Sequence, residues 1–422
     1  MGNARQALAR AAQTFYGDPT RDMAVVGITG TNGKTTISYL LESILDEAGL
    51  SPAVVGTVNY RFKEKVLPAP HTTPEATDLL ARVVEFRAAG AGSVALEVSS
   101  HALEQHRADG LHYRVGVFTN LTPEHLDYHL EMERYFESKC RLFDELLPRD
   151  GGRAVVNVDD SYGARLAARL PETITCGQTT SADIHPVSLM ATLDGIQGTI
   201  HTPGGDLQIN SGLLGDYNIE NLLCSIGAAV ALGLPAQTIE AGLAKASQVP
   251  GRLERIENDR DAVILVDYAH TGDALRRVLD ALRALQPKRL LTVFGCGGDR
   301  DRSKRPVMGE VAAQWSDIAL ATSDNPRTEN PLAILDDVKE GLRRVYRKEW
   351  TPEQARKATE RGCLVIPDRR EAINFAVSLL QAGDLLLVAG KGHEDYQILG
   401  TQKVHFDDRE EIRQALGAGG DA

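Results

Sequence analysis

The chain has 422 residues, of which 42% are hydrophobic and 25% are charged, a composition typical of globular proteins. Its length predicts two or three domains, each with a core of its own. The formal net charge of −12 opposes nonspecific binding to nucleic acid. No apolar run approaches the roughly 18 residues that cross a bilayer, and residues 1–22 lack an apolar signal core. We expect a cytoplasmic monomer that binds neither nucleic acid nor membranes.

The cysteines are few and widely scattered. They are Cys140, Cys176, Cys224, Cys296 and Cys363. Because their number is odd and no two have a paired spacing, we expect reduced, buried thiols and neither a zinc site nor a disulfide framework.

The first predicted elements surround a glycine-rich loop. An apolar run at 23–26 predicts a strand, Gly27–Thr36 follows it, and the pattern at 37–45 predicts a helix. Backbone N–H groups and the positive end of a helix dipole bind phosphate in such a loop, while Lys34 adds a positive charge and the Thr35 hydroxyl can ligate magnesium. The loop is two residues shorter than the classical phosphate-binding pattern, which leaves an ordinary glycine-rich turn as the alternative.

Residues 24–234 alternate short β-branched runs with helical stretches. The predicted strands lie at 53–58, 93–98, 115–119 and 154–158. Such nearly continuous apolar strands are typical of a parallel sheet that is covered on both faces. The segment 173–214 is rich in strands and poor in helices, with turn signals at 193–195 and 203–205. We expect it to form antiparallel strands at the edge of this sheet.

A second series of strands begins near residue 262. Its members lie at 263–267, 290–294, 318–322 and 385–389, and each runs into a loop rich in Gly, Asp, His or Arg. In open α/β sheets, ligands bind at that end of the strands. A turn at 250–252 separates the two series, so the expected domains are 1–249 and 250–422.

Polar residues in the first series have both functional and ordinary interpretations. Glu97 ends a strand and offers magnesium a hard oxygen ligand, or else it is a helix cap or a salt-bridged carboxylate. Among His101, His125 and His129, each of which could be an ordinary interior or rim histidine, only His125 is favoured as a metal contact. Lys139 lies in a predicted helix, and its local sequence, taken alone, predicts a surface lysine.

Two asparagines begin the helix that follows residue 215. Asn218 and Asn221 both lie in its first turn. They either cap the helix or form hydrogen bonds to an adenine or its phosphates, and the residues alone favour neither interpretation.

The charged loops of the second series favour ligand binding. The segment 294–305 follows a buried strand and contains three glycines, which favours a ligand loop over a solvated run of charges. The segments 324–327 and 390–396 follow strands in the same way. A guanidinium can grip a carboxylate while a carboxylate holds an ammonium, so Arg327 and Glu394 could bind the two charged ends of an amino acid.

Taken together, these motifs resemble those of the Mur ligase family. GTNGKTT, EVSSHAL, FTNLTPEHLDYH, YFESK, GDYNIEN, DYAHT, FGCGGDRDRSKRP, SDNPRTENP and GKGHEDYQ occur in the family's order, within a likeness that covers about residues 15–409. The resemblance is strongest to the members that add diaminopimelate. It implies an α/β fold with a central P-loop ATPase domain, built on a mostly parallel sheet, and a C-terminal Rossmann-like domain. Only 26 residues precede Gly27, too few for the family's N-terminal uridine-binding domain. We therefore expect a truncation, a misplaced start, or a short form whose acceptor lacks UDP.

The resemblance also implies roles for individual residues. Nucleotide contacts are expected from Gly30, Thr31, Asn32, Gly33, Lys34, Thr35, Thr36, Asn218, Arg252, Asp267 and His270. Magnesium is expected at Thr35, Glu97, His125 and a carbamate on Lys139, and catalysis depends on Lys34, Lys139, Glu97 and His125. The muramoyl-peptide is expected at Thr72, Thr73, Ser99, Gln105 and Arg107. The diaminopimelate pocket is expected at Arg300, Asp324, Asn325, Arg327, Gly390 and Glu394.

The activity implied by the resemblance is an ATP-dependent ligation in peptidoglycan synthesis. The D-glutamate carboxylate of UDP-MurNAc-L-Ala-D-Glu attacks the γ-phosphate of ATP and releases ADP, with Mg²⁺ neutralising charge. The amine of meso-diaminopimelate then attacks the resulting acylphosphate, which forms the amide and releases phosphate. One alternative is a related ligase with a non-UDP acceptor, and another is a catalytically silent nucleotide-binding scaffold. The presence of Lys34, Thr35, Glu97 and Lys139 counts against the scaffold.

Overall fold

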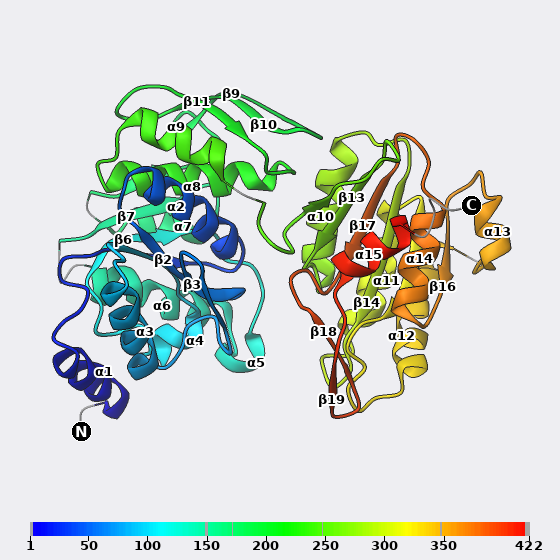
Figure 1. Cartoon of the computed structure of the whole chain (residues 1–422), viewed down its shortest axis with the longest axis horizontal. Helices are drawn as coiled ribbons and strands as arrows, with labels where there is room; N and C mark the ends of the chain where they lie inside the picture. The colour runs from blue at the N-terminus through cyan, green and yellow to red at the C-terminus, as the bar shows by residue number, and fades with distance from the viewer. Residues whose placement is uncertain (1–2, 148–150, 171, 247, 347, 418–422) are drawn as a thin grey trace. The chain divides into compact units, whose positions relative to one another are not determined.

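The computed structural model describes residues 3–147, 151–170, 172–246, 248–346 and 348–417. Its contacts divide the chain into two compact units, Met1–Ser247 and Gln248–Ala422. Each unit has a central sheet of its own (Figure 1). No helix among the described residues is long and apolar enough to span a bilayer.

The first unit is built on an eight-stranded sheet of order β4-β3-β2-β5-β1-β6-β7-β8. The strands are β1 Ala24–Thr29, β2 Pro52–Val55, β3 Asn59–Phe62, β4 Lys65–Pro68, β5 Ser93–Glu97, β6 Tyr113–Phe118, β7 Arg153–Asn157 and β8 Ile174–Cys176. The strands from β2 to β8 in this order are parallel, and β3 and β4 extend the sheet as an antiparallel hairpin. The mostly parallel sheet that the apolar runs predicted is therefore present.

Helices pack around this sheet and complete its core. They are α1 Ala4–Phe15, α2 Lys34–Glu47, α3 Ala76–Ala88, α4 Ser100–Glu104, α5 Leu126–His129, α6 Met132–Arg141, the π-helix η1 Leu142–Leu146, α7 Ser161–Ala167, α8 Tyr217–Ala231 and α9 Ala236–Lys245. Leu79 and Val83 of α3 share one buried cluster with Val25 of β1 and Leu96 of β5. The paired strands β1 and β5 are packed into this core, which fixes the positions where the loops after them begin.

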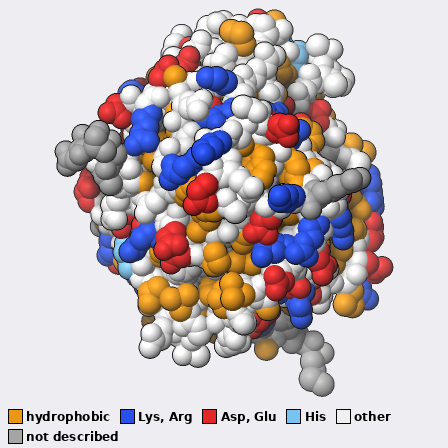
Figure 2. Space-filling view, turned by 90° about the vertical axis from the view of Figure 1, so that its right-hand side faces the viewer, with side chains coloured by type: hydrophobic (Ala, Val, Ile, Leu, Met, Phe, Trp, Pro, Cys, Tyr) orange, Lys and Arg blue, Asp and Glu red, His pale blue; other side chains and the backbone are white. Residues whose placement is uncertain are grey.

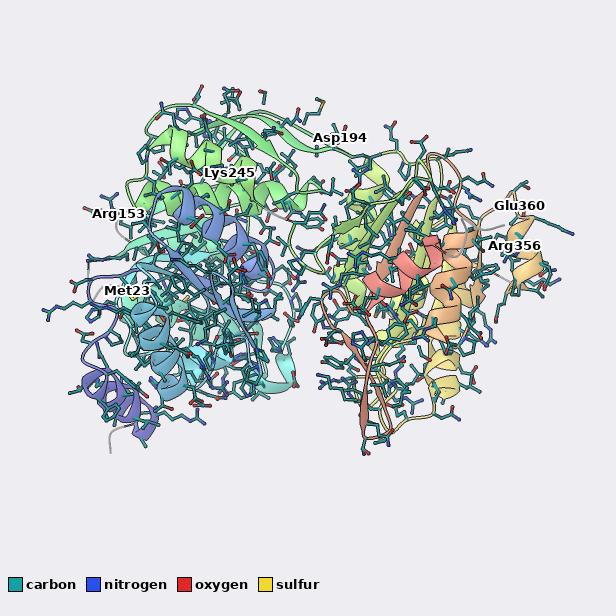
Figure 3. All side chains as sticks on the ribbon, viewed as in Figure 1. Met23, Arg153, Asp194, Lys245, Arg356 and Glu360 are labelled. Carbon is teal, nitrogen blue, oxygen red and sulfur yellow. The ribbon has the colours of Figure 1, made fainter. Side chains whose placement is uncertain are left out.

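The segment 173–214 corrects one expectation. Its strands β9 His185–Thr192, β10 Gly195–His201 and β11 Leu207–Ser211 are antiparallel, as predicted, but they form a separate three-stranded sheet. Figure 3 labels Asp194 in the turn between β9 and β10. The short strand β8 already occupies the edge of the main sheet beside β7. The later strands therefore pair with one another, and the prediction that they extend the main sheet was wrong.

The second unit has a six-stranded sheet of order β12-β13-β17-β14-β15-β16. Its strands are β12 Glu254–Ile256, β13 Val263–Asp267, β14 Leu290–Cys296, β15 Ile318–Ser323, β16 Gly362–Val365 and β17 Leu385–Ala389, and β18 Tyr396–Leu399 pairs with β19 Gln402–His405 in a hairpin. All strand pairs of the sheet are parallel except that of β12 with β13. Since β17 lies between β13 and β14, the loops that follow β13, β14, β15 and β17 emerge at one edge.

Helices and paired surface charges complete the second unit. The helices are α10 Gly272–Ala284, α11 Lys304–Trp315, α12 Pro331–Val345, α13 Pro352–Arg356, α14 Arg369–Ser378 and α15 Asp408–Gly417. Basic and acidic side chains are interspersed on the face of the molecule shown in Figure 2. Exposed pairs such as Arg344 with Glu310, 2.8 Å apart, contribute little stability each.

Candidate active site

The glycine-rich loop joins β1 to α2, as the sequence predicts. Gly33 is the N-cap residue of α2 and has a φ of 90°, in the left-handed region. A Cβ atom at Gly33 would lie 2.2 Å from the Oδ1 of Asn221, and one at Gly30 would lie 1.9 Å from the Oγ1 of Thr119. Both positions therefore require glycine, and the freed backbone forms a cradle at the helix N-terminus that fits phosphate.

Neighbouring side chains hold this loop in place. The amide N–H of Asn32 donates to the Oδ1 of Asn120 (2.9 Å), and the Thr119 hydroxyl donates to the Asn32 carbonyl oxygen (2.6 Å). The hydroxyls of Thr31 and Tyr135 lie 3.1 Å apart. The loop that follows β6 and helix α6 thus fix the cradle, which favours a preformed ligand site over an ordinary surface turn.

Two lysines meet at the carbonyl oxygen of Gly30. The Nζ atoms of Lys34 and Lys139 each donate to it at 2.8 Å, and Lys34 also donates to the Thr31 carbonyl (2.8 Å). Lys139 lies on α6 and is only 1% exposed, so its interpretation as a surface lysine was wrong. Burial, with repulsion from Lys34, holds the pKa of the Lys139 amine well below its usual range.

Glu97 is a buried carboxylate beside the cradle. Its Oε2 accepts hydrogen bonds from the hydroxyls of Thr35 (3.1 Å) and Thr57 (2.8 Å), and its Oε1 accepts one from the Thr57 N–H (3.0 Å). It is not a helix cap, because Ser99 caps α4. The Thr35 hydroxyl and the Glu97 carboxylate are adjacent hard oxygen ligands, a donor set that fits magnesium.

The residues expected to contact the muramoyl-peptide form two groups. The hydroxyl of Thr73 donates to the Glu97 carbonyl (2.8 Å) and accepts from the Ser99 N–H (3.1 Å). The hydroxyl of Thr72 lies 3.0 Å from that of Thr57, which places this first group around Glu97. The second group is Gln105 and Arg107, whose side chains share a hydrogen bond of 2.5 Å.

The three histidines have different environments. The ring of His129 is buried, stacks on Tyr135 at 5.0 Å and has its Nε2 2.9 Å from the Ser100 hydroxyl, so His129 is a satisfied interior histidine. His125 has a φ of 57°, is half-exposed and packs edge-on against His101 at 4.9 Å. Burial lowers the pKa of all three imidazoles. A neutral His125 ring is able to ligate a metal, although no hydrogen bond in the described part of the chain joins it to Glu97.

The two asparagines of α8 are not helix caps. The N-cap residue is Asp216, whose side chain makes no capping bond, while the Asn218 amide donates to the Leu214 carbonyl (2.7 Å). The amide of Asn221 donates to the Oδ1 of Asn218 (2.7 Å), and its own Oδ1 faces Gly33. The capping alternative was therefore wrong, and α8 begins directly against the glycine-rich loop.

In the second unit, Asp267 organises the loop after β13. Its buried carboxylate accepts N–H donors from Leu253 and Ala269, both at 2.8 Å, and burial raises its pKa against the opposing effect of Arg252. The Arg252 guanidinium lies 5.0 Å from the centre of the Tyr268 ring. His270 is exposed, with its Nδ1 2.9 Å from the Tyr268 carbonyl oxygen. Arg252, Asp267 and His270, the predicted nucleotide contacts of this unit, thus lie where β12 begins and the antiparallel strand β13 ends.

The residues expected to bind the amino acid lie at the carboxyl edge of the second sheet. The Asn325 amide donates to the Oε2 of Glu394 (3.1 Å), and an Nη atom of Arg327 donates to the Gly298 carbonyl (2.8 Å). Arg300 is exposed in the loop after β14, Asp324 is buried after β15, and Gly390 begins the loop after β17 with a φ of 118°. This edge therefore carries both a guanidinium and a carboxylate.

Two contributors to these sites, Thr57 and Lys391, are not among the residues that the sequence motifs predicted. Thr57 provides two of the three hydrogen bonds to the Glu97 carboxylate, and Lys391 is fully buried beneath Asn325. Thr57 lies at the end of a predicted strand, which carries no chemical signal of its own. The position of Lys391 between two glycines in a strand-end loop was the available signal.

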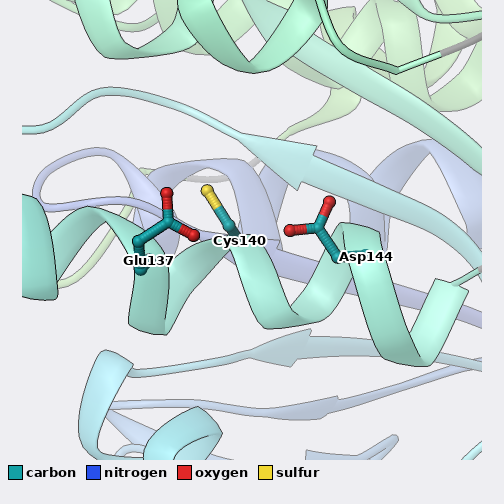
Figure 4. A group of neighbouring side chains, drawn as sticks. All are labelled: Glu137, Cys140 and Asp144. Carbon is teal, nitrogen blue, oxygen red and sulfur yellow. The ribbon is translucent and has the colours of Figure 1, made fainter.

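A cluster on α6 and η1 resembles a metal site but is a salt-bridged group. Figure 4 shows Glu137, Cys140 and Asp144 converging. Arg169 donates to Glu137 (3.2 Å) and to Asp144 (2.6 Å), and burial raises the pKa of the Cys140 thiol to about 12. The thiol is therefore protonated and a poor metal ligand. All five cysteines are buried and free, as predicted.

Comparisons with known proteins match both units. The Mur ligase middle domain matches residues 28–229, and the Mur ligase, glutamate ligase domain matches residues 251–392. A Geobacter metallireducens protein named UDP-N-acetylmuramoyl-L-alanyl-D-glutamate--2,6-diaminopimelate ligase is 51% identical over 98% of this chain and 82% of its own length. A Geobacter sulfurreducens protein of the same name is 50% identical over 99% of this chain and 83% of its own length.

Solved structures show the same relationship. The structure of a ligase with that name has a TM-score of 0.71 and 35% identity, and the match covers all of this chain and 84% of the other. A Mycobacterium tuberculosis folylpolyglutamate synthase has a TM-score of 0.70 at 16% identity over 92% of this chain and 93% of its own, which shows the fold alone. The chain belongs to the Mur ligase family.

Proposed function

We propose that this protein is an ATP-dependent, amide-forming ligase that adds meso-diaminopimelate to the D-glutamate of UDP-MurNAc-L-Ala-D-Glu, in the synthesis of peptidoglycan precursors. The observation that carries the proposal is the 51% identity over 98% of the chain to a protein named for this ligation. The first unit binds ATP and Mg²⁺, and the second unit binds the incoming amino acid.

The ATP-binding residues act on the reacting phosphates. Backbone N–H groups of the glycine cradle hold phosphate oxygens, and Lys34 neutralises the charge that builds up as the acceptor carboxylate attacks. Magnesium supplies Lewis-acid stabilisation of that charge. The Thr35 hydroxyl and the Glu97 carboxylate, 3.1 Å apart, hold one ion, with His125 as a further ligand or a support for one.

Lys139 carries a carbamate in the active protein. Its buried amine has a strongly lowered pKa, so it is readily deprotonated and keeps a lone pair that can attack carbon dioxide. The N–C bond that forms yields a carbamate anion and releases one proton. An anionic oxygen at this buried position supplies the hard ligand that a second magnesium ion requires.

Arg327 and Glu394 set the choice of amino acid. The guanidinium pairs with the distal carboxylate of diaminopimelate, and the Glu394 carboxylate pairs with an ammonium group. A substrate such as lysine lacks the distal carboxylate and leaves the guanidinium without its partner. The expected discrimination against lysine is roughly two orders of magnitude or more.

A ligation assay with purified protein tests this function. With the UDP-linked dipeptide acceptor, ATP and Mg²⁺, we expect efficient use of meso-diaminopimelate and poor use of lysine. Arg327→Ala should lose most activity with diaminopimelate and narrow the gap to lysine, whereas Arg344→Ala, at an exposed arginine of α12, should behave like the unmodified protein. Equal use of both amino acids by the unmodified protein would contradict the proposed specificity.

A further inference from the structure

Lys391 is a fully buried lysine that ties three segments of the second unit together. Its Nζ lies 3.1 Å from the Oδ1 of Asp324, 3.1 Å from the Oδ1 of Asn325 and 2.6 Å from the carbonyl oxygen of Tyr396. The contacts with Asn325 and Tyr396 are hydrogen bonds donated by the ammonium, and the contact with Asp324 is an ion pair. One buried cation therefore links the end of β15, the loop after β17 and the start of β18.

This cation fixes the orientation of the Asn325 side chain. The Oδ1 of Asn325 accepts hydrogen bonds from Lys391 and from the N–H of Ile398 (3.0 Å). If the amide were rotated by 180°, its NH₂ group would face these same two donors, the Lys391 ammonium and the Ile398 N–H. Two donors cannot form a hydrogen bond with each other, and the rotated orientation is therefore excluded. The NH₂ group must then point the other way, where it donates to the Oε2 of Glu394 at 3.1 Å.

The charges around Lys391 distinguish the two nearby carboxylates. Burial opposes ionisation of Asp324, but Lys391 and Arg369 outweigh it and lower the pKa of Asp324. Glu394 lies farther from Lys391, at 3.9 Å, and burial together with Asp324 raises its pKa. Lys391 thus pairs mainly with Asp324, at 3.1 Å, and more weakly with Glu394, at 3.9 Å.

We propose that Lys391 is a positioning residue for the amino-acid site: through Asn325 it orients the Glu394 carboxylate that receives the ammonium group of the incoming amino acid. The inference rests on the proposed function and deepens it, because Lys391 itself touches no substrate. Its second contribution is to balance the negative charge of the buried Asp324 carboxylate, 3.1 Å away.

The test compares Lys391→Met with a control, Lys403→Met. Lys403 is an exposed lysine on β19, 3.6 Å from the ring of the same Tyr396, so its loss removes a nearby charge without touching Asn325. Lys391→Met should raise the KM for diaminopimelate about 10- to 100-fold, the range typical for removal of a supporting hydrogen-bond partner. The KM values for ATP and for the acceptor should stay within about twofold of those of the unmodified protein. A general loss of structure would instead change all three KM values.

A second variant separates an effect on diaminopimelate binding from a loss of folding. Lys391→Met leaves the Asp324 carboxylate buried without its cation, and such a charge can unfold a protein. Asp324→Asn combined with Lys391→Met removes both charges, so this double variant should melt near the unmodified protein and still show a KM for diaminopimelate above that of Asp324→Asn alone.

The coupling of Lys391 to Glu394 decides the outcome. In a Glu394→Gln background, Lys391→Met should add less than about threefold to the KM for diaminopimelate, because residues that act through one another are not additive. Additive effects, or an unchanged KM in a folded Lys391 variant, would overturn the inference and leave the proposed function intact. Failure of the unmodified protein to ligate diaminopimelate would overturn both.

Discussion

At the scale of single residues, the Lys139 amine is buried and has a pKa well below its usual range. We expect Lys139→Ala to lose activity on the order of 100-fold or more, since losing metal-borne charge stabilisation costs several kcal/mol. Short carboxylic acids should partly restore the rate by supplying the missing oxygens. Lys139→Arg, which keeps a cation but cannot form the carbamate, should stay inactive with the acids present. A fully active Lys139→Ala protein would exclude the carbamate.

Glu394 is the matching residue of the second unit, where function and stability oppose each other. Burial, then Asp324, raises its pKa in the folded protein above the unfolded value of about 4.3. Its contribution to stability is therefore complete below about pH 4 and is lost as the pH rises through the higher folded pKa. Glu394→Gln should melt at a higher temperature than the unmodified protein at pH 7, with little difference at pH 4, while its KM for diaminopimelate rises.

Melting curves at both pH values check the prediction for Glu394. Glu360→Gln, at an exposed glutamate, is the control and should leave the melting temperature unchanged at pH 7. A Glu394→Gln protein that is less stable than the unmodified protein at pH 7 would refute the argument from burial.

At the scale of elements, the two ends of helix α2 offer a matched pair of glycines. Gly33, before the helix, has a φ of 90° and a neighbour that would clash with a Cβ, whereas Gly49, after it, has a φ of 71° and open space around it. Alanine at either position should cost about 1–2 kcal/mol of stability for the left-handed backbone. Only Gly33→Ala displaces Asn221 and the phosphate cradle, so only it should raise the KM for ATP, by about tenfold or more. Equal KM values for the two variants would remove the cradle assignment.

At the scale of the whole molecule, ligand binding is linked to stability. A nucleotide bound with Mg²⁺ at 100 times its Kd stabilises the folded state by about 2.7 kcal/mol, which corresponds to roughly 5–10 °C in melting temperature. We expect that shift with a non-hydrolysable ATP analogue and Mg²⁺, and its loss with a chelator. Lys34→Ala should abolish the shift, whereas Lys245→Ala, at an exposed lysine of α9 labelled in Figure 3, should keep it. A full shift in the Lys34 variant would contradict its role at the phosphates.

The sequence by itself determined the central parallel strands of each sheet, the glycine cradle and the edge of each sheet where polar residues gather, but not the edge strands β3, β4, β12 and β16 or the hairpin of β18 and β19. The features that it determined depend on local sequence. Runs of apolar residues form buried strands, and a backbone position with a left-handed φ favours glycine at that position. The motifs of the Mur ligase family are also visible in the sequence in their usual order, and they contain the residues expected to bind ATP and an amino acid.

The tertiary structure alone decided which side chains are buried and what they touch. The local sequence predicts a surface lysine at position 139, but α6 packs against the glycine cradle and buries it. The local sequence also predicts that the strands after β8 extend the main sheet, but β8 itself occupies the edge of that sheet. Lys391 acquires a role only when Asp324 and Tyr396, far apart in the chain from one another, converge on its ammonium. Burial and hydrogen-bond partners depend on contacts between distant segments, and no local pattern of residues encodes them.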